Sequence, residues 1–196
     1  MNRREVLERV ALLMGGAVSA SAMTGILAAF EAPKEGAYAP QALSSAQDEL
    51  VATIAELIIP TTDTPGARAA GVNRFIDGVL TAIYTEAEGK RFLAGLVDLE
   101  ARAQARGSSF LASSVTTQVQ ILRELEAESI ALPSGSAHES FFHVLKELTL
   151  IGYYRSEIGA TQEQKWLVVP GYYKGDVPYK EIGRAWSSPW MRGISR

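Results

Sequence analysis

Few side chains in this sequence are of a kind that performs chemistry. The chain has two histidines, His138 and His143, and no cysteine. In a zinc-protease helix two histidines stand four residues apart, so that both rings share one face. The spacing of five found here places the rings about 140° apart around a helix. The pair therefore predicts no metal site, and the lack of cysteine excludes disulfides, thiolate zinc sites and iron–sulfur ligation by this chain.

The sequence also contains no motif for nucleophilic or acid–base catalysis. No serine lies in a Gly-x-Ser-x-Gly motif, and no glycine-rich phosphate-binding motif is present. The paired acidic residues lie on the polar faces of predicted helices, which indicates solvated surface charge; they are Asp98, Glu100, Glu124, Glu126 and Glu128. We therefore expect no catalytic, cofactor-binding or metal-binding residue in this chain.

One loop, residues 60–71 (PTTDTPGARAAG), leaves two interpretations open. It precedes a predicted helix N-terminus and contains Arg68, and both features attract anions. Asp63 opposes an anion, however, and no strand leads into the loop. The structural interpretation is that Asp and Thr side chains bind backbone donors while Pro65 and Gly66 fix the turn. Such a rigid loop can present a surface to a partner.

Most of the chain between residues 44 and 159 shows the spacing of apolar residues that is typical of helices. Ser45, with Asp48 three residues later, predicts a helix start, and Thr85 with Glu88 predicts another. Apolar residues at helical spacing predict five helices, which cover about residues 45–59, 72–83, 86–106, 116–130 and 139–154. We therefore expect a mostly α protein whose residues 44–159 form a small helical bundle.

The last of these helices differs from the others because it is apolar around nearly its whole circumference. Its apolar side chains are Phe141, Phe142, Val144, Leu145, Leu148, Leu150, Ile151, Tyr153 and Tyr154. A helix of this kind is either central to a bundle or covered by a partner.

Helical periodicity stops after Gly159, and residues 160–196 are rich in aromatic side chains. Disordered tails are normally poor in aromatics, so we expect an extended C-terminal arm whose aromatics pack onto something. They are Trp166, Tyr172, Tyr173, Tyr179, Trp186 and Trp190. Packing on the chain's own core and packing on a partner both remain open, and six such side chains favour a large interface.

The first 30 residues resemble an export signal. Arg3 and Arg4 precede an uncharged apolar run from Val10 to Phe30, which is typical of the twin-arginine route for folded proteins. An uncleaved transmembrane helix is the alternative, and cleavage near Ala22 or near Ala29 is undecided. Residues 31–43 are predicted to be a linker. The chain carries a net charge of −3 and no basic stripe, so nucleic acid is not an expected partner.

Two stretches closely resemble the signatures of the gluconate 2-dehydrogenase subunit 3 family. The first is ELIIPTTDTPGARAAGVNRFID (Glu56–Asp77), and the second is FFHVLKELTLIGYYRSEIGATQEQKWLVVPGYYKGDVP (Phe141–Pro178). The twin-arginine start and a late Arg-Ala-Trp run (Arg184–Trp186) also fit the family. The resemblance covers nearly the whole chain.

The resemblance implies a non-catalytic small subunit of a periplasmic, membrane-associated sugar or sugar-acid dehydrogenase. In such complexes a large flavoprotein of the glucose–methanol–choline type holds FAD and performs catalysis, and a cytochrome c subunit often accepts the electrons. The small subunit carries the export signal, which the twin-arginine machinery reads, and the flavoprotein is exported with it. This chain is therefore expected to stabilise its partner and escort it to the periplasm.

The partner interface is predicted to include six residues of the second signature stretch and the arm. They are Tyr153, Tyr154, Glu157, Trp166, Tyr172 and Trp186. Two other hypotheses compete with the subunit hypothesis. The chain can be a stand-alone periplasmic binding or structural protein whose arm covers its own core. A free-standing enzyme would need a catalytic group that the sequence does not show.

Overall fold

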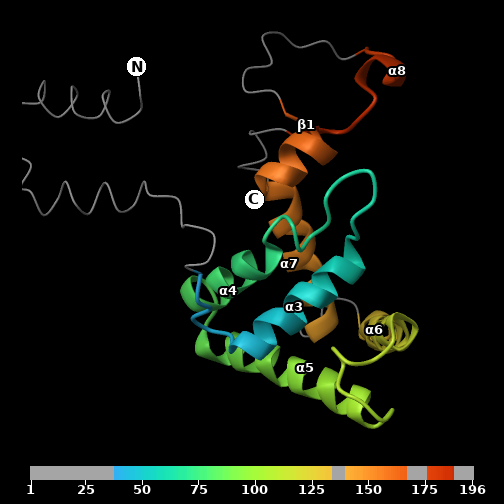
Figure 1. Ribbon diagram of the computed structural model, residues 1–196. Helices are drawn as coiled ribbons and strands as arrows, with labels where there is room; N and C mark the ends of the chain where they lie inside the picture. Colours follow the sequence, from blue (N-terminus) through green and yellow to red (C-terminus); the bar gives the residue numbers. More distant parts are fainter. Residues whose placement is uncertain (1–37, 134–139, 167–175, 188–196) are drawn as a thin grey trace, which may run out of the picture. The chain divides into compact units, whose positions relative to one another are not determined.

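The computed structural model describes residues 38–133, 140–166 and 176–187. The chain divides into two compact units, residues 1–39 and 40–196, and every described helix and strand lies in the second. The longer helices of this unit are α3 (Ser45–Ile58), α4 (Val72–Ala82), α5 (Glu86–Gln104), α6 (Val115–Ile130) and α7 (Phe141–Arg155) (Figure 1). The prediction of a mostly helical protein is confirmed.

Short elements follow α7. They are the π-helix η2 (Gly159–Glu163), strand β1 (Lys165–Trp166), helix α8 (Tyr179–Ile182) and strand β2 (Trp186–Ser187). β1 pairs in parallel with β2, with Lys165 opposite Trp186. Because residues 167–175 and 188–196 lie outside the described residues, the extended arm over residues 160–196 stays a prediction.

Helix α3 begins one residue earlier than its sequence pattern predicts. Its N-cap is Ser44, whose side chain accepts a hydrogen bond from the Gln47 backbone, while the Gln47 side chain accepts one from the Ser44 backbone. Asp48, the predicted partner of Ser45, instead accepts both hydrogen bonds of the Asn73 amide and so links α3 to α4. The predicted capping box of Thr85 and Glu88 at the start of α5 is confirmed.

A buried carboxylate extends the helical unit toward the N-terminus. Asp77, on α4, accepts three hydrogen bonds of 2.9 Å from the backbone N–H groups of Gln41, Ala42 and Leu43. The carboxylate is only 3% exposed, and Leu43 belongs to the hydrophobic core. The compact unit accordingly starts at Pro40, within the segment that the sequence assigns to a linker.

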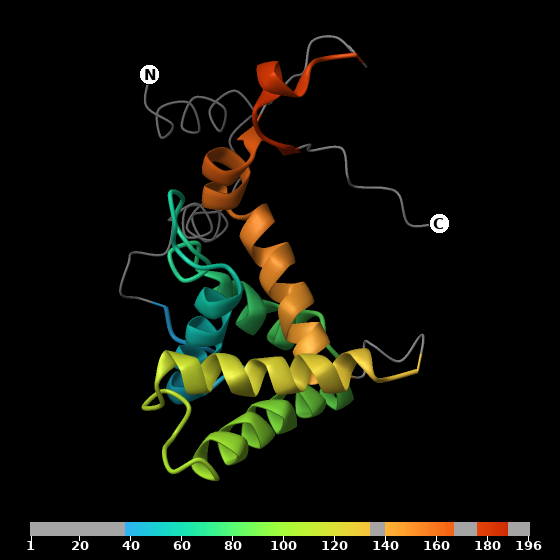
Figure 2. The ribbon, with the colours of Figure 1, turned by 90° about the vertical axis from the view of Figure 1, so that its right-hand side faces the viewer.

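The core forms where α7 meets the other helices. Figure 2 shows α7 in orange crossing the adjacent pair α5 and α6, and α7 also packs against α3 and α4. One face of α7 supplies Phe142, Leu145, Leu148 and Tyr153 to the core. At Gly152, an added Cβ would lie 2.7 Å from the Phe75 ring, so glycine permits the close approach of α7 to α4. Of the two interpretations of this apolar helix, its contacts with α3, α4, α5 and α6 support a central place in the bundle, and coverage of its exposed face by a partner stays a prediction.

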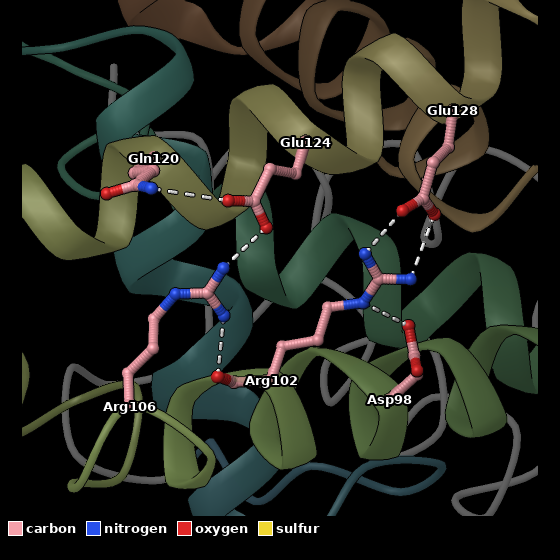
Figure 3. Close-up of polar contacts among 6 residues, drawn as sticks. All are labelled: Asp98, Arg102, Arg106, Gln120, Glu124 and Glu128. Carbon is pink, nitrogen blue, oxygen red and sulfur yellow. Dashed lines mark hydrogen bonds and ion pairs between the residues drawn. The ribbon is translucent and has the colours of Figure 1, made fainter.

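Several acidic residues of α5 and α6 form ion pairs at the surface. The Arg102 guanidinium donates to Asp98 one turn earlier and to both carboxylate oxygens of Glu128 on α6. Arg106 donates to Glu124, as Figure 3 shows, and Lys146 on α7 pairs with Glu126. The side chains of Asp98, Glu124, Glu126 and Glu128 are 38–58% exposed, which agrees with their interpretation as solvated surface charge. Glu100 is half-buried and accepts a hydrogen bond from the Phe110 N–H.

Candidate partner-binding surface

The loop between α3 and α4 is held from within by a single carboxylate. Glu56, in the last turns of α3, accepts hydrogen bonds through one oxygen from the Thr61 N–H and hydroxyl, both at 2.8 Å. Its other oxygen accepts the Arg68 N–H at 2.9 Å. Glu56 therefore joins the two ends of the loop. The Thr61 hydroxyl accepts the Gly66 N–H, as the structural interpretation expects, whereas Asp63 accepts from the Thr62 hydroxyl and not from the backbone.

The packing around Glu56 requires glycine at position 66. A Cβ there would overlap the Glu56 carboxylate and lie 2.6 Å from the Thr61 backbone nitrogen. Burial acts to raise the pKa of Glu56, but the hydrogen bonds from Arg68 and Thr61 and the charge of Arg68 hold that pKa below its ordinary value. Glu56 is thus a charged, internally satisfied anchor of the loop.

The Arg68 guanidinium binds side chains of α3 in this structure. Its guanidinium donates to Glu49 at 3.0 Å and to the Thr53 hydroxyl at 2.8 Å, both on α3. Because these contacts occupy the guanidinium, the geometry gives the anion-binding interpretation no support. Arg68 instead fastens the loop to the side of α3.

The loop and α7 meet through Tyr153. This side chain is 1% exposed, and its hydroxyl donates a 2.8 Å hydrogen bond to the Pro65 carbonyl. Burial raises the pKa of Tyr153, as do the nearby charges of Glu163 and Glu56, although a hydrogen bond with Thr64 acts in the opposite direction. Tyr153 is therefore a neutral phenol that joins the first signature stretch to the second.

A second contact joins the loop to the segment after α7. The Thr64 hydroxyl donates to the Glu163 carboxylate of η2 at 2.6 Å, across 99 residues of sequence. The turn between α7 and η2 is equally close-packed, because a Cβ at Gly159 would overlap the Tyr153 carbonyl oxygen. The two signature stretches thus form one continuous structure.

The outward face of α7 is apolar in its second half. Residues His143, Glu147, Leu150, Ile151 and Tyr154 recur at helical spacing and are all exposed; we call them the outer stripe of α7. Its C-terminal part consists of Leu150, Ile151 and Tyr154, each 37–40% exposed. The Tyr154 ring stands edge-on to the Tyr153 ring at 5.3 Å, so a buried residue supports it. Contiguous exposed apolar side chains of this kind mark interaction surfaces.

The short strands after η2 carry two more exposed aromatics. Trp166 and Trp186 are 43% and 42% exposed, and the Lys165 ammonium lies 4.7 Å from the centroid of the Trp186 ring. The Arg184 guanidinium also donates to the Gln162 carbonyl of η2. These contacts tie β2 to the end of the helical part without placing either tryptophan in the core.

The predicted interface residues thus fall into three groups. Tyr154, Glu157, Trp166 and Trp186 are exposed. Tyr153 is buried, so it can support an interface only by positioning Tyr154. Tyr172 lies outside the described residues, as do Arg3 and Arg4, for which a targeting role is predicted. Whether any of these residues touches a partner stays a prediction.

Three residues of this region were missed by sequence reasoning. Glu56, Thr64 and Glu163 all lie inside the signature stretches, but only the folded loop shows what they bind. The one available signal was the density of hydrogen-bonding side chains around Pro60–Gly66, which predicts a loop with internal contacts.

In the described residues, no group of three histidine or acidic side chains is placed to hold a metal ion. His143 is exposed on α7, and His138 lies outside the described residues. Among the helices that the structure describes, none is long and apolar enough to cross a membrane. What this region offers is a rigid, partly apolar surface.

Comparison with known proteins agrees with this description. The family model for "Gluconate 2-dehydrogenase subunit 3" matches residues 45–171, which include α3 to β1 and the outer stripe of α7 but not Trp186. No curated protein and no solved structure shows significant similarity to the chain. The match covers more than half of the sequence, all of the first signature stretch and the second one up to residue 171. The chain belongs to the gluconate 2-dehydrogenase subunit 3 family.

Proposed function

We propose that this chain is the non-catalytic small subunit of a sugar or sugar-acid dehydrogenase complex, in which it binds and stabilises a flavoprotein of the glucose–methanol–choline type. FAD and catalysis belong to that partner, and a cytochrome c subunit can complete the complex. The family name supports the association with a dehydrogenase. The observation that carries the proposal is the exposed apolar end of the outer stripe of α7, a helix that Tyr153 joins to the α3–α4 loop.

The physical argument rests on how this surface is built. A partner that covers Leu150, Ile151 and Tyr154 gains apolar burial of about 25 cal/mol per Å2. The surface needs little ordering on binding, because Tyr153 and Glu56 already fix α7 and the loop. Exposed aromatic side chains such as Trp166 and Trp186 are the type that dominates interface energetics.

Co-purification tests the subunit assignment directly. A tagged chain, expressed with the genes beside its own, is expected to bring down a yellow flavoprotein with dehydrogenase activity. Ile151→Asp places a charge on the outer stripe and should weaken the complex by about 30-fold, the effect of a hot spot of about 2 kcal/mol. Ile130→Asp is the matched control, because Ile130 is an exposed isoleucine at the end of α6. Recovery of a stable, colourless monomer would favour a stand-alone protein.

We further propose that Arg3 and Arg4 direct the complex to the periplasm through the twin-arginine machinery. The proposal follows from the sequence of the first 30 residues and from the absence of cofactor motifs in this chain. The double change Arg3→Lys and Arg4→Lys should leave the flavoprotein active but retained in the cytoplasm. Undiminished periplasmic activity in that variant would show that the escort role is wrong.

A further inference from the structure

A small pocket lies at the opposite end of the outer stripe of α7. It has a volume of about 140 Å3 and is formed by the α4–α5 turn, α5 and the first turns of α7. Three aromatic side chains, Tyr84, Phe92 and Phe141, line it. Its volume suits the end of one side chain.

The aromatic walls of this pocket are preformed. The Phe92 and Phe141 rings meet edge to face, with centroids 5.3 Å apart and an interplanar angle of 67°. Phe141 rests on Gly95, where any Cβ would overlap its ring. Since Phe92 is buried as well, the rings keep this arrangement without a ligand.

The pocket also carries an excess of negative charge. It contains the carboxylates of Glu88 and Glu147 and the single guanidinium of Arg91. Glu88 is engaged through one oxygen by the Thr85 N–H and hydroxyl, and the charge of Arg91 acts on it as well. Glu147 is exposed and makes no hydrogen bond or ion pair with any residue that the structure describes. Burial raises the pKa of Tyr84, and the negative charges of Glu147 and Glu88 raise it further.

We propose that this pocket receives an arginine side chain of the partner protein, with the guanidinium against the aromatic rings and its N–H groups donating to Glu147. The inference rests on the proposed function for the identity of the partner. Aromatic faces and carboxylates together favour a cation. A guanidinium is planar and more weakly hydrated than an ammonium, so it suits this site better than lysine. Glu147 precedes Leu150 and Ile151 on the outer stripe, so pocket and stripe form one continuous surface.

A ligand titration tests the pocket without any partner. The full chain, isotopically labelled, is titrated with N-acetylarginine amide while the NMR signals of Tyr84, Phe92 and Phe141 are followed. The neutral analogue N-acetylcitrulline amide and N-acetyllysine amide are run in parallel. We expect the arginine derivative to bind most tightly and Glu147→Gln to weaken it about fivefold, the upper range for an exposed ion pair. Glu86→Gln, an exposed α5 glutamate that does not line the pocket, should change nothing.

Three results of this titration would overturn the inference. They are equal binding of the citrulline derivative, tighter binding of the lysine derivative, and unchanged affinity in Glu147→Gln. Thermal unfolding of both variants checks that they remain folded.

Co-purification then separates this inference from the proposed function. If the flavoprotein accompanies the wild-type chain and Glu86→Gln but is reduced severalfold with Glu147→Gln, the inference holds for the complex. If it accompanies all three equally, the pocket assignment is wrong and the subunit assignment stands. If no flavoprotein accompanies the wild type, the subunit assignment is wrong, and the titration alone decides whether the pocket binds arginine.

Discussion

The α5–α6 face and the loop–α7 region are both joined by polar contacts, but the contacts differ in kind. Between α5 and α6, charged side chains pair at the surface, with Arg102 bridging Asp98 and Glu128. Between the loop and α7, a buried phenol meets a backbone carbonyl, and glycines bring the chain segments close together. Surface ion pairs are each worth about 0–1 kcal/mol, whereas an unpaired buried polar group costs about 1–3 kcal/mol.

This difference bears on where a partner can bind. On the α5–α6 face the charged groups are paired within the chain, so the face presents a satisfied polar surface. In the loop–α7 region the polar groups are satisfied internally, and the outward face of α7 is left apolar. The loop–α7 region is therefore the better candidate for association, and breaking its internal contacts should cost more stability.

The largest effect is expected from Gly159→Ala. The added methyl would overlap the Tyr153 carbonyl oxygen and lie 3.0 Å from the Tyr154 Cα, so the backbone after α7 must shift. We expect the free energy of unfolding to fall by about 2–3 kcal/mol, as measured by urea denaturation. Gly89→Ala is the control, because a Cβ there meets open space within helix α5. It should stabilise the chain by about 0.5–1 kcal/mol, and equal effects of the two changes would contradict the described turn.

Tyr153→Phe should have the next largest effect. It removes only the hydroxyl and leaves the Pro65 carbonyl without the donor that binds it in the structure. The expected loss in the free energy of unfolding is about 1–2 kcal/mol. Tyr154→Phe makes the same chemical change on the neighbouring exposed ring and should cost less than about 0.5 kcal/mol. If the two variants unfold at the same urea concentration, the hydrogen bond between Tyr153 and the Pro65 carbonyl does not stabilise the fold.

Much of the helical framework is predictable because it depends on local patterns. The apolar spacing from Val72 onward predicts α4, and the Thr85–Glu88 pair predicts the start of α5. At the start of α3, however, two adjacent serines are each followed three residues later by a suitable acceptor side chain. In the structure Ser44 is the N-cap, and Asp48 is bound by Asn73 of another helix, a contact that no local pattern reveals.

The candidate surface was predictable only in part. Tyr153 and Tyr154 are adjacent and chemically alike, and only the packing of α7 decides that one is buried and the other exposed. The carboxylates of α6 are exposed, as their spacing indicates, but the spacing does not reveal their partners Arg102, Arg106 and Lys146 from other parts of the chain. Both differences arise from tertiary contacts between residues distant in sequence.

Arg102→Gln tests how much the surface ion pairs between α5 and α6 contribute to stability. It removes the ion pairs with Asp98 and Glu128 and should cost about 1 kcal/mol at low salt. Because salt screens exposed charges, this cost should shrink markedly in 1 M NaCl, while the cost of Tyr153→Phe stays constant. Lys90→Gln removes only the pair with Glu86 within α5, so it should change the free energy of unfolding by no more than about 0.5 kcal/mol. A cost of Arg102→Gln that is independent of salt would mean that packing of its alkyl chain matters more than its charge.

The smallest effect is expected in the pH dependence set by Glu56. Its pKa is lower in the folded chain than in the unfolded one, since hydrogen bonds from Arg68 and Thr61 outweigh the opposing effect of burial. The stabilisation is therefore complete above the pKa of an unfolded glutamate, about 4.3, and is lost as the pH falls through the lower folded pKa. Urea unfolding between pH 7 and pH 3 should show that the free energy of unfolding falls less steeply with acid in Glu56→Gln than in the wild type.

Glu128→Gln should also make this fall less steep, because Arg102 holds the pKa of Glu128 below its ordinary value, but it should do so only at low salt. Salt screens an exposed ion pair but not hydrogen bonds to backbone N–H groups. If the difference between Glu56→Gln and the wild type disappeared in 1 M NaCl, Glu56 would act as an exposed surface charge and not as a hydrogen-bonded anchor of the loop.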